Sequence, residues 1–294
     1  MSTHLCDTRL GAVEVVYLPG DRPPVVFFPG GHCSAASDCG WRLYTSQGFG
    51  VLAFSRPGYG ATDVGALTAA EFVPAVVECC DQMGVGETSA AVGVSFGGMQ
   101  AIHAARTASH LIPRLILHSC APSTHAYPDT AHERLLAPVS FAPAVERLTW
   151  AAVARLVASE TGLRRMVGAL SSLPTGTWWH TWSTGDKDRA RTLFRSMRSG
   201  GGFVNDLRQA RTDRSLYRQR IQAGIPCPTL VTASRHDGGV AFAHAVDQAH
   251  TIQRSTLVEL GAPSHLFWLG PEVAEAQEAV SKFLNGHDAN TGGS

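Results

Sequence analysis

Short uninterrupted apolar runs, separated by stretches long enough to form helices, constrain the fold of this chain more than any other feature. Residues 25–28 and 51–54 are each four consecutive apolar residues that lead into turns containing Pro and Gly. Such runs are typical of strands that are buried on both faces of a sheet. Further strands are expected at residues 12–18, 89–94, 114–118, 228–233 and 255–259. The pattern predicts an α/β fold: a mostly parallel central sheet with helices on both faces.

Helices are expected between these strands. The one expected over residues 69–83 has a clear start signal, because Thr68 can cap its first turn and Glu71 can complete a capping box. Other helices are expected over residues 36–47, 97–109, 241–250 and 271–285.

The alternation of strands and helices stops between residues 123 and 224, where only helix-compatible segments are evident. The portions on either side, residues 1–122 and 225–285, complete a single α/β pattern. We therefore predict one α/β core that is interrupted by a helical cap over residues 123–224. Residues 286–294 are polar and rich in glycine, and we expect them to form a flexible tail.

Charge and composition exclude several classes of partner. Lys plus Arg and Asp plus Glu number 24 each, so no overall field favours nucleic acid or an anionic membrane. No apolar run approaches the ~20 residues that span a bilayer, and the first ten residues lack the features of a secretory signal. The seven cysteines show no CxxC pair or zinc-ligand spacing, which indicates reduced thiols. We expect a cytoplasmic protein with a small-molecule substrate, no nucleic-acid or membrane partner and no metal; the oligomeric state stays open.

The pentapeptide Gly93-Val94-Ser95-Phe96-Gly97 is the motif that says most about chemistry. It follows an expected strand and opens an expected helix, which is the context that a G-x-S-x-G motif requires. The tight turn leaves little room beside the serine, so small residues are needed two positions to either side. Such a turn raises the hydroxyl above the sheet and directs the helix N-terminus at developing negative charge. We predict that Ser95 is a nucleophile; the alternative is an ordinary serine in a turn.

A serine hydroxyl needs a neighbouring base to take its proton. Asp237 follows the strand expected at residues 229–233, and His265 lies in the loop after residues 255–259. Both lie at carboxyl ends of strands and follow the chain order Ser, Asp, His. We predict a triad of Ser95, Asp237 and His265. Asp129 is the alternative acid, although its Pro-Asp-Thr setting also suits a turn or a helix cap.

These motifs together resemble the α/β-hydrolase fold superfamily, from about residue 12 to residue 285. The resemblance implies a serine hydrolase of esterase type without a cofactor, whose cap is inserted after the sixth strand. Pro29-Gly30-Gly31-His32 stands where many members carry a His-Gly-x oxyanion loop, and Pro29 replaces the histidine. The resemblance implies that the Gly31 and Phe96 N–H groups bind the oxyanion, with the His32 N–H as an alternative to that of Gly31.

Aromatic residues are frequent in the expected cap. Trp178, Trp179 and Trp182 lie close together, and the surrounding sequence adds Phe141, Trp150, Phe194 and Phe203. Their aromatic rings could fill the core of the cap or form an apolar lid over the substrate. We retain the three tryptophans as candidate substrate-binding residues.

Hydrolysis of a small carboxylic ester is the function that the sequence favours. The same triad could instead hydrolyse a C–C bond or act as an aminopeptidase. Proline-iminopeptidase-like families usually carry a Gly-Gly-Pro loop and a Gly-Gly-Ser-x-Gly elbow, and this chain departs from both. A non-catalytic ligand receptor is the other class, which a damaged triad or a blocked oxyanion loop would favour.

Overall fold

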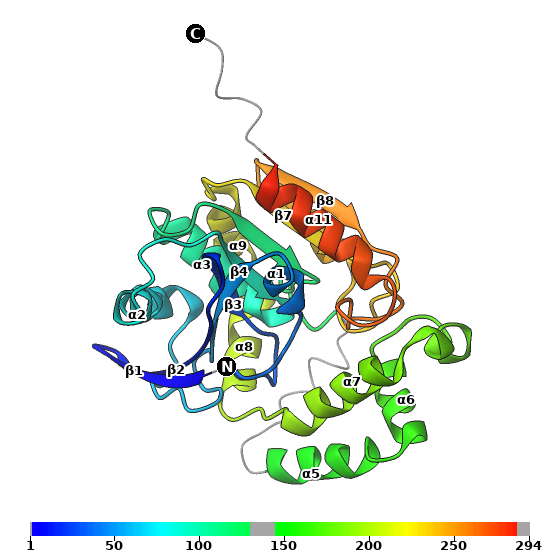
Figure 1. The fold of residues 1–294 in the computed structure, drawn as a ribbon. Coiled ribbons are helices and arrows are strands. Elements are labelled where there is room, and N and C mark those ends of the chain that lie inside the picture. Colours follow the sequence, from blue (N-terminus) through cyan, green and yellow to red (C-terminus); the bar gives the residue numbers. More distant parts are fainter. Residues whose placement is uncertain (1, 130–144, 287–294) are drawn as a thin grey trace.

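A single eight-stranded sheet forms the centre of the molecule in the computed structural model, which describes residues 2–129 and 145–286 (Figure 1). The strands are β1 (Ser2–Thr8), β2 (Gly11–Leu18), β3 (Arg22–Phe28), β4 (Phe49–Phe54), β5 (Ala90–Val94), β6 (Leu115–His118), β7 (Thr229–Ala233) and β8 (Ser255–Glu259). Their order across the sheet is β1-β2-β4-β3-β5-β6-β7-β8. Only the pairs β1–β2 and β2–β4 are antiparallel in the described part of the chain. The expected α/β fold with a mostly parallel sheet is confirmed.

Helices cover both faces of this sheet. The strand β3 shows why, because Val25 and Phe27 belong to one buried cluster while Val26 and Phe28 belong to another. Successive side chains of a strand point to opposite faces, so a fully apolar strand needs a cover on each side. The first face packs against α1 (Arg42–Thr45) and α11 (Val273–Asn285); the second packs against α2 (Ala69–Gln82), α3 (Gly98–Thr107) and α10 (Phe242–Thr251).

Two local features differ from the sequence expectation. The helix expected over residues 36–47 is reduced to the four residues of α1. The Asp38 carboxylate accepts the main-chain N–H groups of Gly40 and Trp41, and Gly40 has a φ of 108°, which a helix cannot contain.

The strand β1 was not expected, because its side chains are mostly polar and exposed and it pairs only with β2. The Thr68–Glu71 capping box at the start of α2 is present as expected.

The described part of the chain between β6 and β7 consists of helices joined by loops. It contains α5 (Glu146–Leu156), α6 (Glu160–Gly168), α7 (Thr184–Ser196), α8 (Gly202–Gln209) and α9 (Ser215–Ala223). Figure 1 shows α5, α6 and α7 standing apart from the sheet, whereas α9 packs against α3 and α10. Phe141 lies outside the described residues, as does the expected tail except for Gly286.

The described residues hold no helix that is long and apolar enough to cross a membrane, and no cluster of three or more metal-ligating side chains. All seven cysteines are buried free thiols.

Candidate active site

Ser95 lies on a sharp turn between β5 and α3. Its φ is 53°, a left-handed conformation that non-glycine residues rarely adopt and that is often found at functional sites. The two flanking glycines are required by close packing: a Cβ atom at Gly97 would collide with the Phe28 carbonyl oxygen, and one at Gly93 with the main chain of Gly98. The G-x-S-x-G spacing is therefore explained by sterics at this turn.

Asp237 and His265 form a hydrogen-bonded pair. The distance from His265 Nδ1 to Asp237 Oδ2 is 2.7 Å, and the Asp237 side chain is only 1% exposed. The other carboxylate oxygen of Asp237 accepts the main-chain N–H groups of Gly239 (2.7 Å) and Val240 (2.9 Å). Since an ionised carboxylate only accepts hydrogen bonds, Nδ1 of His265 carries a proton and Nε2 is left as the basic atom of the neutral ring.

Burial and charge act in opposite directions on the pKa of His265. Burial lowers this pKa, whereas the charge of Asp237 and its hydrogen bond raise it, and the net direction is upward. Asp237 therefore stabilises the imidazolium that would form if His265 accepted a proton.

Asp129, the alternative acid, is paired with a different histidine. Its carboxylate lies 2.8 Å from His244 Nε2 and accepts the Ala241 N–H at 3.2 Å. The other ring nitrogen of His244 is 2.9 Å from the Ser123 hydroxyl. This arrangement ties the segment after β6 to the start of α10 and leaves Asp237 as the acid beside His265.

Ser95 and His265 line the same cavity, which has a volume of about 260 Å³. The other described lining residues are mostly apolar or aromatic, and include Cys33, Cys39, Tyr127, Trp150, Met166, Leu170, Leu193, Phe194, Met197, Phe203, Leu266 and Trp268. None of the described lining residues is Asp, Glu, Lys or Arg. The cavity therefore offers a small, apolar space next to a hydroxyl and an imidazole.

The structure places Trp178, Trp179 and Trp182, the candidate substrate-binding residues, away from this cavity. None of the three lines the cavity, and all are buried against one another with ring centroids 5.4–6.1 Å apart. The Trp179 indole N–H also donates to Glu160 at 3.1 Å. Aromatic rings that can bury this much surface together are drawn into a core, not left as a pocket wall.

Other aromatic residues of the chain between β6 and β7, hereafter the insertion, line the cavity instead. Trp150, Phe194 and Phe203 line it, and Trp268 joins them from the segment just after His265. The first three lie near the tryptophan cluster in sequence, whereas Trp268 lies far from it. Its position three residues after His265 was the available signal.

The loop after β3 packs directly against the serine turn. A Cβ atom at Gly30 would lie 3.2 Å from Ser95 Cβ, and one at Gly31 would lie 3.2 Å from the Phe96 ring. Arg56 holds this loop by donating to the Pro29 and Gly30 carbonyl oxygens at 2.9 and 3.0 Å. The loop is thus fixed close to the place where an oxyanion would form.

The main-chain N–H of His32 interacts with the Tyr59 hydroxyl. Burial raises the pKa of Tyr59 well above its ordinary value, and this N–H opposes the rise. The His32 ring lines the cavity with its Nδ1 atom 2.8 Å from the Ser199 hydroxyl, and burial lowers its pKa to about 3. His32 is therefore neutral at ordinary pH.

A segment of the insertion joins the two loops that carry Asp237 and His265. The carbonyl oxygen of Leu170 accepts the N–H of Gly238 at 3.0 Å and the N–H of His265 at 2.9 Å. Leu170 also lines the cavity. These main-chain contacts position the acid and the base relative to each other, and no side-chain pattern in the sequence indicates them.

Comparison with known proteins identifies the family of this fold. Residues 25–278 match the model of the alpha/beta hydrolase family, so the chain belongs to this family. A protein of Bacillus subtilis (strain 168), named uncharacterized hydrolase YcgS, is 29% identical over 270 residues, which are 90% of this chain and 92% of that protein.

Solved structures with the same fold cover almost the whole chain. An alpha/beta hydrolase fold protein from Nakamurella multipartita has a TM-score of 0.74 and 21% identity, with 96% of this chain and 99% of that chain covered. A thermophilic esterase from Thermogutta terrifontis has a TM-score of 0.67 and 20% identity, with 97% and 98% covered. At these identities the likeness concerns the fold.

Proposed function

We propose that this protein is a serine hydrolase that cleaves a small carboxylic ester through an acyl-enzyme on Ser95. The observation that carries the proposal is the buried Asp237–His265 pair, whose histidine shares a cavity with a serine in a strained strand-to-helix turn. Membership of the alpha/beta hydrolase family supports the same chemistry.

In the first half of the reaction the Ser95 hydroxyl oxygen attacks the carbonyl carbon of the ester. His265 Nε2 takes the hydroxyl proton, and Asp237 stabilises the resulting imidazolium. Collapse of the tetrahedral intermediate breaks the bond to the alcohol, which leaves with the proton from His265. Water then attacks the acyl-enzyme with His265 again as the base, and the acid is released.

The negative charge on the tetrahedral intermediate needs donors that are already in place. We assign this role to the N–H groups of Gly31 and Phe96, because Phe96 directly follows Ser95 and a Cβ atom at Gly31 would lie 3.2 Å from the Phe96 ring. The His32 N–H is the alternative to that of Gly31.

The cavity limits the size and charge of the substrate. A volume of about 260 Å³ lies below the roughly 300–1,000 Å³ of sites for drug-sized ligands. The described lining has no charged side chain that could pair with an ionised group. We infer that the parts of the ester next to its carbonyl are short and uncharged.

Replacement of the serine tests the proposal. Ser95→Ala should abolish turnover of p-nitrophenyl esters and covalent labelling by a fluorophosphonate. Ser119→Ala is the matched control, because Ser119 also has a positive φ of 47° and follows a neighbouring strand, β6. Labelling that persists in Ser95→Ala, or that is lost in Ser119→Ala alone, would contradict the assignment of the nucleophile.

A further inference from the structure

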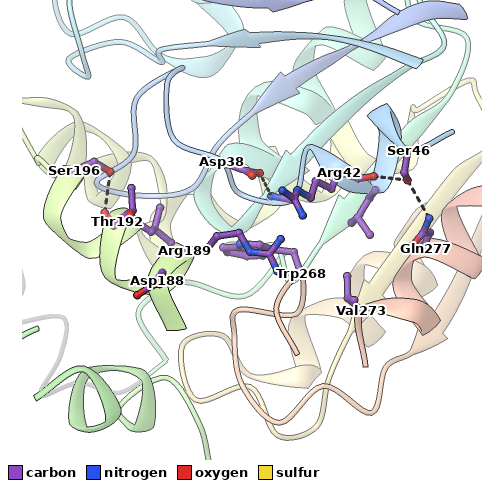
Figure 2. A pocket seen from close by; sticks show the side chains of 13 residues that line it. Asp38, Arg42, Ser46, Asp188, Arg189, Thr192, Ser196, Trp268, Val273 and Gln277 are labelled. Atoms are coloured by element: carbon purple, nitrogen blue, oxygen red, sulfur yellow. Dashed lines mark hydrogen bonds between the residues drawn. The ribbon is translucent and has the colours of Figure 1, made fainter. Parts of the chain in front are cut away.

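A second cleft lies beside the cavity that contains Ser95. Its volume is about 620 Å³, and it is formed by α1, α7, α11 and the segment around Trp268 (Figure 2). This volume is within the range of small-molecule sites. Leu193 and Trp268 line both the cleft and the Ser95 cavity, so the two spaces share a wall.

Two arginines bring hydrogen-bond donors into this cleft. Arg42, on α1, is exposed, and its guanidinium forms no ion pair or hydrogen bond with another residue in the described ranges. Arg189, on α7, pairs with Asp186 through Nη2, but its buried Nε atom has no hydrogen-bond partner among the described residues. In Figure 2 the two arginine side chains extend into the cleft from opposite sides.

Each of the two carboxylates that line the cleft has one oxygen engaged by a residue other than Arg42 or Arg189. Asp38 accepts the N–H groups of Gly40 at 3.0 Å and Trp41 at 2.9 Å, and Asp188 pairs with Arg191. Neither carboxylate pairs with Arg42 or Arg189 among the described residues, so guanidinium N–H groups of both arginines stay available to a ligand. A ligand that complements them must supply acceptor atoms, and a carboxylate matches the planar guanidinium best.

One part of the lining suits an apolar ligand body, while Ser46, Thr192, Ser196 and Gln277 are polar. Leu43, Trp268 and Val273 present hydrocarbon and indole surface in the same cleft. We propose that this cleft is a second ligand site that binds an amphipathic carboxylate, with its carboxylate between Arg42 and Arg189 and its apolar body against these three residues. Because Trp268 also lines the Ser95 cavity, an occupied cleft would fix one wall of that cavity.

Direct binding measurements test this site without relying on hydrolysis. We would titrate 3-phenylpropanoate and its uncharged amide, 3-phenylpropanamide, into the full-length protein by isothermal calorimetry. The acid should bind at least about tenfold more tightly than the amide, because hydrogen bonds to charged groups are the stronger ones. Arg42→Gln and Arg189→Gln should each weaken acid binding about tenfold and leave amide binding unchanged.

Arg195→Gln is the matched control, because Arg195 is exposed on the same helix as Arg189 and does not line the cleft. Its binding of the acid should equal that of the wild type. Arg42 is exposed and has no side-chain partner within residues 2–129 and 145–286, so its replacement tests the site even if Arg189→Gln fails to fold. Equal affinity for acid and amide, or acid binding that survives Arg42→Gln undiminished, would overturn the proposal, since Arg42 does not line the Ser95 cavity.

Discussion

At the scale of single residues, the two oxygens of the Asp237 carboxylate have different partners, and this explains how the candidate base His265 is oriented. One oxygen is held by two main-chain N–H groups, and the other faces His265 Nδ1. This leaves the carboxylate with one orientation, so the tautomer and the ring position of His265 are both set by Asp237.

The pH profile of hydrolysis should report the raised pKa of His265. The proposed base works when neutral, so kcat/KM should rise with pH, with a midpoint above the ordinary histidine value of 6.5. Asp237→Asn should move the midpoint down, because both influences that raise the pKa are lost. His32 and His118 have pKa values lowered to about 3 by burial, so neither titrates in this range. A flat profile from about pH 5 to 9, with chemistry rate-limiting, would contradict a histidine base.

Replacement of the two aspartates should distinguish the acids. Asp237→Asn should lower kcat by about 10⁴, because the amide favours the wrong imidazole tautomer. Asp129→Asn should leave kcat near the wild-type value, since Asp129 pairs with His244. Steady-state kinetics on one p-nitrophenyl ester measures both effects. The reverse pattern would show that Asp129 is the functional acid.

At the scale of elements, the aromatic residues of the insertion divide into two groups. Trp178, Trp179 and Trp182 pack on one another. They belong to the same buried cluster as the apolar side chains of α11. Phe194, on α7, lines the Ser95 cavity. The insertion therefore supplies both its own packing and a wall of the site.

These two groups should respond differently to truncation. Trp182→Ala should lower the free energy of unfolding by about 3–5 kcal/mol and leave the acyl chain-length preference unchanged. Phe194→Ala should change the discrimination between esters that differ by one methylene, by about 1–3 kcal/mol. Urea unfolding and kcat/KM across an ester series measure the two effects. A changed preference in Trp182→Ala with none in Phe194→Ala would reverse our assignment.

At the scale of the whole molecule, a buried ion pair joins the core to the insertion. Arg56, just after β4, lies 2.6 Å from Asp206 on α8, and the Tyr59 hydroxyl donates to the same carboxylate. Burial opposes the charge of Arg56, but Asp206 and Tyr59 outweigh it, so the pKa of Arg56 is raised. The Arg56 guanidinium, which donates to the Gly30 carbonyl oxygen, is thus positioned by Asp206 of the insertion.

Removal of one partner should be costly. Asp206→Ala should lower the free energy of unfolding by about 3–5 kcal/mol, because the Arg56 charge stays buried without a partner. The double variant Arg56→Met/Asp206→Leu should recover much of this loss in urea unfolding. Glu259→Ala, which breaks the exposed pair with Arg235, is the control and should cost at most about 1 kcal/mol. A small effect of Asp206→Ala, comparable to this control, would contradict the structural role of the pair.

The sequence by itself determined the features that depend on short-range sterics and periodicity. Apolar runs marked the central strands, Thr68 and Glu71 marked the start of α2, and the two glycines around Ser95 marked the turn. The strand runs and the capping box follow from atoms a few residues apart, so a local pattern contains the information. The glycine spacing is also visible in the sequence, although the atom that a Cβ at Gly97 would meet is the Phe28 carbonyl oxygen of another strand. The chain order of Ser95, Asp237 and His265, each at the end of an expected strand, predicted the candidate triad.

The tertiary structure decided everything that depends on partners distant in the chain. The packing of the insertion on the core determines which aspartate faces His265 and which aromatic rings line the cavity. It also brings Leu170 to the two loops of the site, which its carbonyl oxygen joins. The sequence offers Asp129 and Asp237 as candidate acids, but it does not show which of the two pairs with His265. That choice is made by packing, since a hydrogen bond of 2.7 Å exists only where the whole fold brings its two atoms together.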